Sequence, residues 1–494
     1  MNFIAFDNEI VLYWDKEWQY PDGVRYEVAV NDQRFTTEKT HFRITELQPQ
    51  TEYAITVERV ATDGVPAGVL FSDTLCTGVA KKRLDITKAP YFAVGDNQTL
   101  NTNAIQKALN DCTADACVYI PAGVYLTGAL DVHSDTEIFV DEGAVLQGTA
   151  SVDDYAPKIA SRFEGIETLC YRSLINIGKM ESNGGYNCRN IVLRGGGSIL
   201  GGGGDLACAV IERERGTDPN GDRTVLGRAR NRLIQVNNTE NVVIGNLTLG
   251  YSSAWNLHFL YSKKILTYGC KLYSKGVWNG DGWNPDSSED CTIFDTEFEV
   301  GDDAIAIKSG KNPQGNIINR PTQNVRVFDC VCHCSHGLSI GSELSGGVKN
   351  VWIWDTDFVR SWCGIRVKTT RKRGGFVQNL RVRNCKLADV QITTGYTCND
   401  DGDGSGELTR ISDFYFENVT VYGVSHQEKT GAVCVPPIFI FGFAEKEYYI
   451  RNVCFNNVCI IEREDGEMQN ISLKCVSDLH INGLHYKRKT GVEL

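Results

Sequence analysis

The strongest constraint on the fold is a repeated unit in the second half of the sequence. Each unit has a polar residue, a short β-branched run and a second short strand, as in NVVIGNLTL and NVRVFDCVC. Six polar residues hold equivalent positions in successive units: Asn241, Lys264, Asp290, Asn324, Asn350 and Asn379. They are 23, 26, 34, 26 and 29 residues apart. Strand-only units of this length predict a parallel β-helix with one shared core, because a β-propeller blade needs about 40 residues.

The N-terminal part does not follow this repeat. Residues 1–78 contain EIVLYW, RYEVAV, HFRITEL and EYAITVERV, which alternate in polarity as half-buried strands do. The stretch LQPQTEY, ending at Tyr53, resembles the tyrosine corner of fibronectin type III domains, and Trp14 stands where their early core tryptophan lies. We therefore expect an all-β chain. It has a fibronectin type III-like β-sandwich over 1–78 and a right-handed parallel β-helix over 84–494, with one helix from Thr102 to Cys112.

Charge and cysteine content limit the partners and the compartment. A net charge of −12 disfavours nucleic acid and anionic membranes, so an acidic ligand would need a local basic patch. No apolar run approaches the length of a membrane span, and the first residues do not resemble a signal peptide. Eighteen cysteines without such a leader favour reduced, buried thiols. We expect a cytoplasmic protein, or a secreted or periplasmic one if a leader was removed, with its oligomeric state left open.

Three cysteines follow one another at alternate positions in CVCHC. In a strand, Cys330, Cys332 and Cys334 face the same side, where small apolar thiols suit a β-helix interior. A zinc site would need a fourth ligand and a turn-like spacing. The pattern favours core packing.

One aspartate lies about one coil before a pair of adjacent aspartates. Asp281 is followed 21 residues later by Asp302 and Asp303, and equivalent positions on successive coils of a β-helix are about 4.8 Å apart. Each motif alone is ordinary turn chemistry. Together they predict a carboxylate patch in which at least one pKa is raised, so that a proton donor lies beside ionised carboxylates. Hydrolysis of a glycosidic bond needs that combination.

From Leu84 to the end, the chain resembles glycoside hydrolase family 28, the polygalacturonases. The family pattern is matched in order by four segments: Asn279-Gly280-Asp281, Gly301-Asp302-Asp303, Ser335-His336-Gly337 and Arg366-Val367-Lys368. The segment AVGDNQTLNTNAIQKALNDC also resembles the family's N-terminal cap. Gly280, Ser335 and Asn284 depart from the usual residues, and Asn284 bears on the substrate rather than on hydrolysis.

The resemblance implies catalytic roles for four residues. Asp302 would be the general acid, Asp281 and Asp303 would hold and deprotonate the attacking water, and His336 would tune the acid. The reaction would invert the anomeric configuration and would need no cofactor and no metal.

The resemblance also implies a set of substrate-binding residues: Arg366, Lys368, Asn279 and Lys308. Arg366 and Lys368 are two residues apart on one strand, which suits a substrate carboxylate. The basic run continues with Arg371, Lys372 and Arg373, which are weaker candidates.

Other candidates have ordinary structural explanations beside the functional one. Aromatic side chains that could stack on a sugar are Trp283, Trp354, Trp362 and Tyr396, although aromatics on such strands more often belong to the core. Residues 399–407 (NDDGDGSGE) resemble a calcium loop without its full spacing, which favours an acidic surface loop. His258 is expected to be a packed histidine.

A long insertion bears on the mode of attack. Residues 201–232 interrupt the repeat and are expected to wall off one end of the groove, which favours exo action on oligogalacturonides. Pro285 within GDGWNP is also closer to the exo-acting branch. The alternatives are a rhamnogalacturonan galacturonohydrolase, a calcium-dependent pectate lyase-like enzyme and a non-catalytic sugar-binding β-helix.

Overall fold

A computed structural model describes residues 1–17, 24–61, 66–333, 335–423, 425–428, 431–434, 436–461 and 471–487. The chain divides into two compact units. Residues 1–83 with 115–117 form the first, and residues 84–114 with 118–494 form the second. No helix in the described ranges is long and apolar enough to cross a membrane.

The N-terminal unit contains two antiparallel sheets around one core. The first sheet has the order β1-β2-β5 and the second β4-β3-β6-β7. Their strands are β1 (Asn2–Ala5), β2 (Ile10–Tyr13), β3 (Arg25–Val30), β4 (Gln33–Thr37), β5 (His41–Ile44), β6 (Glu52–Val60) and β7 (Pro66–Cys76). Trp14 is buried edge-on against Tyr26 at 5.0 Å, and the backbone N–H of Gln48 donates to the Tyr53 hydroxyl at 3.0 Å. This is the β-sandwich geometry expected for residues 1–78.

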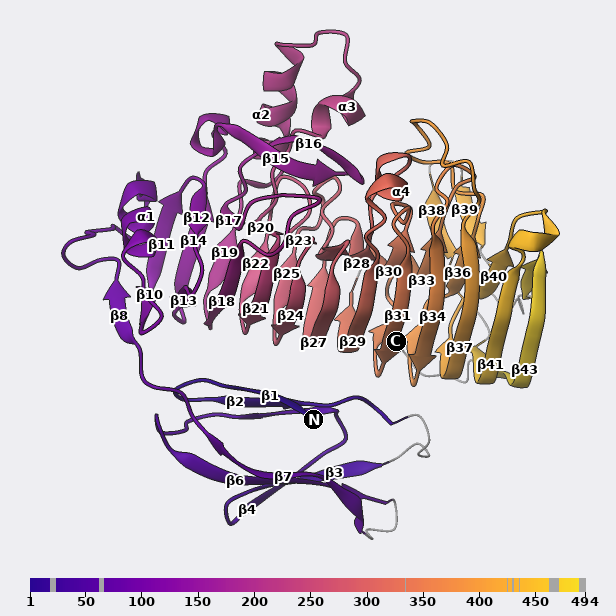
Figure 1. The fold of residues 1–494 in the computed structure, drawn as a ribbon, viewed down its shortest axis with the longest axis horizontal. Coiled ribbons are helices and arrows are strands. Elements are labelled where there is room, and N and C mark those ends of the chain that lie inside the picture. Colours follow the sequence, from indigo (N-terminus) through magenta and orange to yellow (C-terminus); the bar gives the residue numbers. More distant parts are fainter. Residues whose placement is uncertain are drawn as a thin grey trace. The chain divides into compact units, whose positions relative to one another are not determined.

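The second unit is a parallel β-helix (Figure 1), which confirms the predicted fold class. One sheet, called the floor sheet below, consists of eleven parallel strands. They are β12 (Leu130–Val132), β17 (Ile175–Ile177), β20 (Ile234–Asn237), β23 (Leu257–Leu260), β26 (Trp283–Asp286), β28 (Asp303–Ile307), β30 (His336–Gly341), β33 (Cys363–Lys368), β36 (Val390–Thr393), β40 (Ile438–Phe441) and β42 (Ser472–Lys474).

The other walls of the coil belong to one sheet of 21 strands. They are β8 (Lys82–Asp85), β9 (Asp96–Leu100), β10 (Ala116–Ile120), β11 (Gly123–Thr127), β13 (Glu137–Val140), β14 (Ala144–Gly148), β18 (Cys188–Gly195), β19 (Ser198–Leu200), β21 (Thr239–Gly245), β22 (Thr248–Gly250), β24 (Lys263–Tyr268), β25 (Lys271–Tyr273), β27 (Glu289–Glu299), β29 (Thr322–Cys332), β31 (Val348–Trp354), β32 (Asp357–Phe358), β34 (Phe376–Arg383), β35 (Lys386–Leu387), β37 (Arg410–Val421), β41 (Ile450–Ile461) and β43 (Val476–Lys487).

The remaining elements are short. They are α1 (Thr102–Asn110), α2 (Gly203–Arg215), α3 (Arg223–Gly227), α4 (Gln314–Ile318), two 3-10 turns (Val152–Tyr155 and Lys446–Tyr448), and two hairpins made by β15 (Lys158–Phe163) with β16 (Ile166–Tyr171) and by β38 (Ser425–Glu428) with β39 (Gly431–Cys434). The helix predicted from Thr102 to Cys112 is present as α1.

The repeated polar residues lie at the corners of the coil. All six equivalent residues of the sequence repeat have a positive φ, between 54° and 65°. Asparagine tolerates this left-handed conformation, and its amide can bond to the coil below. Asn324 Nδ2 donates to Asp290 at 2.9 Å, Asn350 to Asn324 at 3.0 Å and Asn379 to Asn350 at 2.8 Å. The repeat therefore records a backbone corner that recurs in each coil.

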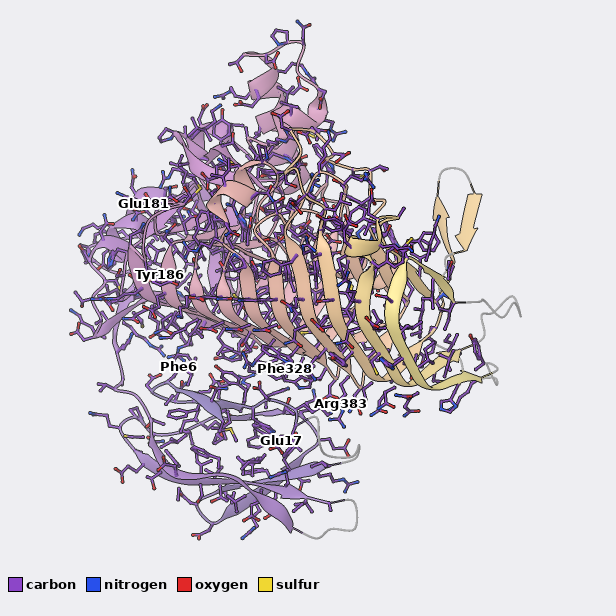
Figure 2. The ribbon with its side chains drawn as sticks, turned by 45° about the vertical axis from the view of Figure 1, so that its right-hand side comes forward. Phe6, Glu17, Glu181, Tyr186, Phe328 and Arg383 are labelled. Carbon is purple, nitrogen blue, oxygen red and sulfur yellow. The ribbon has the colours of Figure 1, made fainter. Side chains whose placement is uncertain are left out.

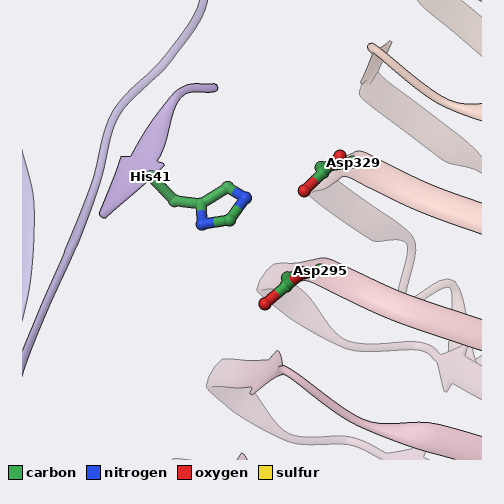
Figure 3. A group of neighbouring side chains, drawn as sticks. All are labelled: His41, Asp295 and Asp329. Carbon is green, nitrogen blue, oxygen red and sulfur yellow. The ribbon is translucent and has the colours of Figure 1, made fainter. Parts of the chain in front are cut away.

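A second corner falls within the long strands. Asp295 and Asp329 have φ values of 50° and 48° and lie side by side, because the flanking residues of β27 and β29 are paired. Figure 3 shows these two carboxylates on neighbouring strands. The strand bends at this point and enters the next face of the coil.

Four buried aromatic side chains stack on one another across successive strands. Tyr268, Phe294, Phe328 and Trp354 form a column with ring centroids 5.7, 4.8 and 4.4 Å apart, and Figure 2 labels Phe328 within it. Cys330 and Cys332 are buried, as predicted, whereas Cys334 lies outside the described residues. The sixteen cysteines that the structure describes form no disulfide.

Candidate active site

Three carboxylates and one imidazole gather where floor strands begin. Asp281 precedes β26, Asp302 and Asp303 stand at the start of β28, and His336 begins β30. Asp303 and His336 are paired across neighbouring strands, and the backbone N–H of Gly282 donates to the Asp303 carbonyl at 3.0 Å. The sequence placed these residues on adjacent coils, and the structure brings them together there.

Asp281 is a buried carboxylate that faces one lysine. It is 2 % exposed, and Lys308 Nζ lies 3.0 Å from its Oδ2. Burial holds its pKa well above the ordinary value. Lys308 opposes this shift, while the negative charges of Asp302 and Asp303 add to it. Asp281 therefore binds a proton more readily than an ordinary aspartate does.

Asp303 has the opposite electrostatic environment. Lys368 Nζ lies 2.9 Å from its Oδ2, and the Ser339 hydroxyl donates to its Oδ1 at 2.7 Å. Burial alone would raise the pKa of Asp303, but Lys368 and His336 outweigh burial and hold that pKa well below the ordinary value. Asp303 therefore stays ionised.

Asp302 is the most exposed carboxylate of the cluster. Its side chain is 29 % exposed, compared with 6 % for Asp303. His336 Nδ1 lies 3.3 Å from Oδ1 of Asp302 and 3.1 Å from Oδ1 of Asp303. Burial lowers the pKa of His336, but hydrogen bonds and charge from both aspartates raise it to about 9. An imidazolium thus faces the most exposed carboxylate of the cluster.

A guanidinium lies farther along the floor sheet. Arg366 on β33 is paired with Ser339 on β30, and its Nε makes no hydrogen bond within the described structure. Tyr396 lies beneath both basic residues, 5.3 Å from Arg366 Cζ and 5.5 Å from Lys368 Nζ. Because Lys368 is already paired with Asp303, Arg366 is the better placed of the two to receive an anion from the cleft.

The other predicted binding residues contact the protein itself. Asn279 Oδ1 accepts a hydrogen bond from Arg230 at 2.6 Å, and Lys308 is the partner of Asp281. Arg371 pairs with Glu445, while Lys372 and Arg373 donate to the carbonyls of Asp400 and Asn399. The basic run after Lys368 therefore holds the acidic loop in place.

Of the candidate sugar-stacking aromatics and His258, some lie in the core and one lies at the surface. Trp283 and Trp354 are buried, and His258 is enclosed between Gln235 at 2.8 Å and Asp286 at 3.2 Å. Trp362 is 54 % exposed and meets His336 edge-on at 5.8 Å, so it can offer a face to a ligand.

The acidic loop 399–407 is bound by basic side chains. Asp401 in this loop pairs with Lys311 and with Arg228, the latter at 3.1 Å. These ion pairs compete with a calcium ion for the carboxylate, in line with the expected acidic surface loop.

A hairpin that the sequence reasoning missed lies across the floor sheet. Arg162 on β15 donates to Asp286 of β26 at 2.7 Å and contacts Tyr261, and Phe163 stacks on Trp255 at 4.9 Å. Figure 1 shows β15 and β16 running over the region of β20 and β23. The local signal was a pair of short strand-like runs, KIASRF and IETLCY, on either side of Glu164-Gly165.

The predicted insertion 201–232 supports this hairpin. Lys158 of β15 pairs with Glu214 of α2 at 2.9 Å, and Arg228 pairs with Glu164 at the hairpin tip at 2.9 Å. The segment closest to the floor strands is therefore the hairpin, with the insertion packed behind it.

The hairpin also borders a separate cavity of about 1070 Å³. Pro157, Ile159 and Ala160 line it on one side, and Asp131, Asn176 and Asn237 of the floor strands line it on another. None of the four acid–base residues lines this cavity, so it is separate from the carboxylate cluster.

Asp302, Asp303 and His336 present ligand atoms within 4.8 Å of one another, a spacing that a metal ion could use. However, Lys368 already supplies a positive charge to Asp303, and His336 is held as a cation. The cluster is arranged for proton transfer rather than for a divalent ion.

Comparisons with known proteins give one family. Residues 117–435 match the model of glycosyl hydrolases family 28. The chain is 26% identical over 473 residues to an exo-poly-alpha-D-galacturonosidase of Dickeya chrysanthemi, which covers 88% of this chain and 75% of the relative. It is 32% identical over 321 residues to a probable polygalacturonase of Vitis vinifera, covering 63% of this chain and 62% of the relative.

Solved structures give the same fold. A family 28 exopolygalacturonase of Yersinia enterocolitica superposes with a TM-score of 0.82 at 22% identity, covering 99% of this chain and 98% of that one. An exopolygalacturonase of Thermotoga maritima superposes with a TM-score of 0.64 at 21% identity, covering 81% of this chain and 92% of that one.

Proposed function

The chain belongs to family 28 of the glycosyl hydrolases, and we propose that it cleaves α-1,4-linked galacturonic acid from the ends of pectic oligosaccharides. The observation that carries this proposal is the cluster of Asp281, Asp302 and Asp303. Burial and neighbouring cations shift the pKa of Asp281 and that of Asp303 in opposite directions within one site, and Asp302 is the exposed member. Enzymes that hydrolyse glycosides by inversion need an acid and a base held apart in this way.

The proposed mechanism uses each carboxylate differently. Asp302, exposed and facing the His336 imidazolium, protonates the glycosidic oxygen as the bond to the leaving sugar breaks. Asp303, kept ionised by Lys368, holds the attacking water with Asp281. Burial raises the proton affinity of Asp281, which takes the proton of that water. Water attacks from the face opposite the leaving group, so the configuration inverts.

We propose an acidic substrate because the guanidinium of Arg366 has an Nε that makes no hydrogen bond within the described residues. Arg366 offers a planar fork to a carboxylate, and Tyr396 beneath it offers an aromatic face to a sugar ring. Lys368 adds positive charge while it holds Asp303, and we propose that Asn279 and Lys308 complete the binding set next to Asp281. An anionic chain can thus be bound locally by a protein of net charge −12.

Exo action is proposed from the hairpin β15–β16. It is anchored on the floor sheet by a buried ion pair between Arg162 and Asp286, on the side of the cluster that faces β23. A groove interrupted there would admit one end of a chain and not its middle. The name of the Dickeya chrysanthemi relative, an exo-poly-alpha-D-galacturonosidase, supports the same mode.

A product profile tests the proposal. The purified protein is incubated with EDTA on galacturonic acid oligomers and on polygalacturonate, beside an Asp302→Asn variant. Small products from the first time point, slow loss of viscosity and an inactive variant are expected. Mixed oligomers would overturn exo action, whereas an equally active variant would overturn the mechanism.

The same assay separates the remaining alternatives. Release only from rhamnogalacturonan fragments would change the substrate, and an unsaturated product lost in EDTA would indicate a lyase. Binding without any product would indicate a sugar-binding protein.

A cytoplasmic location is also proposed. Burial raises the pKa of the Cys270 and Cys363 thiols, and buried thiols of this kind suit a reducing compartment. Cell fractionation of the native protein tests this point, and recovery from the medium or periplasm would contradict it.

A further inference from the structure

Cations and aromatic rings are linked by contacts in a cluster beside Asp281, called the stack below. Its members are Trp278, Arg230, Phe163, Arg232, Trp255 and Lys308, and Phe163 also stacks directly on Trp255 at 4.9 Å. Arg230 Cζ lies 4.0 Å from the ring centroid of Trp278 and 5.2 Å from that of Phe163. Arg232 Cζ lies 4.4 Å from Phe163 and 4.8 Å from Trp255, and Lys308 Nζ lies 3.6 Å from Trp255. Each cation therefore meets at least one aromatic face.

The two arginines of this stack are buried without a carboxylate. Arg230 is 0 % exposed and Arg232 is 1 % exposed, and within the described residues neither forms an ion pair. Arg230 donates to three carbonyls, at Gly227, Ser253 and Trp278, and to the Asn279 side chain. A buried charge paired only with neutral acceptors is costly, so such an arrangement calls for a functional reason.

Arg230 binds the turn that carries the catalytic carboxylate. Its Nη1 donates to the Trp278 carbonyl at 2.8 Å, and its Nη2 donates to Asn279 Oδ1 at 2.6 Å, two residues before Asp281. Asn279 adopts a positive φ of 51°, which is a conformation that needs support from its surroundings. A planar fork fixes both the direction and the spacing of this turn, which a lysine ammonium cannot do.

The rest of the stack reaches the same carboxylate from the other side. Phe163 comes from the hairpin β15–β16, Trp255 precedes β23, and Lys308 follows β28. Trp255 supports the Lys308 ammonium from below, and that ammonium contacts Asp281 at 3.0 Å. Asp281 is thus held through its own backbone turn and through its lysine partner.

We propose that Arg230 is a positioning residue for the hydrolytic reaction. It fixes the turn formed by Trp278 and Asn279. Through Phe163, Arg232 and Trp255 it also holds Lys308 against Asp281. This inference rests on the proposed function of the carboxylate cluster. It gives the insertion 201–232 a second task, because the segment that supports the hairpin also aligns the base that accepts the proton of the water.

The charges around Asp281 make the proposal measurable. Lys308, Asp302 and Asp303 face this carboxylate, and the positive charges of Arg230 and Arg232 also act on it. Burial raises the pKa of Asp281, and each nearby cation opposes that rise. Removing the Arg230 charge is therefore expected to raise the Asp281 pKa further.

Two variants of the full chain separate charge from geometry. Arg230→Gln removes both the charge and the fork, and Arg230→Lys keeps the charge alone. On a galacturonic acid oligomer, we expect kcat of Arg230→Gln to fall by roughly 10- to 100-fold with KM nearly unchanged, because misplacement of a reacting group acts on the chemical step. The acidic limb of its kcat–pH profile should move to higher pH. In Arg230→Lys, kcat should fall while the limb stays in place.

Arg223→Gln is the matched control. Arg223 lies 4.9 Å from the same Trp278 ring but is exposed and belongs to α3. Its loss should leave kcat, KM and the pH profile unchanged. If Arg230→Lys and Arg230→Gln lowered only the melting temperature, with kcat and the pH profile unchanged, Arg230 would have a purely structural role.

One measurement does not depend on the substrate or on a fully folded Arg230→Gln. A crystal structure of Arg230→Lys should show the Asn279 side chain and the Lys308 ammonium displaced from their present contacts. An undisturbed Lys308–Asp281 pair in that structure would overturn the positioning role. If the wild-type protein released nothing from galacturonic acid oligomers, the proposed function would fail instead, and the structure of the variant would still decide the positioning role.

Discussion

At the scale of single residues, the site depends on unequal carboxylates. Asp281 and Asp303 are both buried, but each meets a different lysine, Lys308 or Lys368. Because Lys368 and His336 act together on Asp303, that carboxylate stays ionised, while burial gives Asp281 a higher affinity for the proton that the attacking water gives up. The exposed Asp302 is then the group left to meet the glycosidic oxygen.

Asp302→Asn should remove the acid without damaging the fold. Its side chain is among the more exposed of the cluster, so the melting temperature should change little. General acid catalysis typically contributes about 10²- to 10⁴-fold, and kcat should fall by at least that factor. Release of reducing sugar and differential scanning calorimetry on the same samples check both parts. Retained activity would transfer the role of acid to another group.

His336 should make stability depend on pH above neutrality. Its pKa is raised to about 9 from an ordinary value near 6.5, so its contribution is complete below pH 6.5 and is lost as pH rises through about 9. The ring is partly exposed, and we expect a contribution of about 1–3 kcal/mol.

Denaturant unfolding of the wild type and of His336→Gln at pH 6, 8 and 10 measures this contribution. The difference in unfolding free energy should shrink between pH 6 and pH 10. A difference that stays constant with pH would show that the histidine is not held as a cation.

At the scale of elements, the hairpin β15–β16 determines how much of a polymer can enter. Replacing residues 160–169 by an Asn-Gly turn removes the part that lies over the floor sheet. We expect mixed oligomers and a faster loss of viscosity than in the wild type. Loss of Arg162 also removes the cationic partner of Asp286, leaving that carboxylate with His258 and the Gly310 backbone N–H, so the melting temperature should fall.

Product chromatography on polygalacturonate decides whether the hairpin is the wall. An unchanged product profile in the shortened but folded variant would assign exo action to another segment, with the acidic loop 399–407 as the next to be shortened.

At the scale of the whole molecule, the corner ladder joins successive coils. Asn350 has a φ of 57°, donates to Asn324 and accepts from Asn379. Asn350→Ala should cost about 2–4 kcal/mol, because it loses both hydrogen bonds and strains a left-handed corner. Asn350→Gly loses the bonds but suits the corner, so it should cost less. Guanidinium unfolding of both variants measures the difference, and equal costs would mean that the corner conformation contributes little.

The sequence predicted the parts of this molecule that recur or that lie close together along the chain. A polar residue at each left-handed corner marks the repeat, and the two aspartate motifs mark the cluster. The sequence could not predict the lysine partners, because Lys308 and Lys368 lie on strands well beyond the carboxylates they contact. Nor could it place the hairpin, which is fixed by contacts such as Arg162 to Asp286, 124 residues apart in the chain. From the sequence, the insertion 201–232 is expected to form the wall at the end of the groove, because it is longer than the hairpin segment.

The corners also divide the β-helix into regular coils and the segments inserted between them. The same corner conformation returns whether a coil takes 23 residues or 34, since the extra residues between Asp290 and Asn324 leave at one edge, where α4 forms. Segments on that edge are therefore candidates for exchange between relatives, while the coils stay unchanged. The proposed role of Arg230 limits such exchanges, since a replaced segment that included residue 230 would remove the support of Asp281.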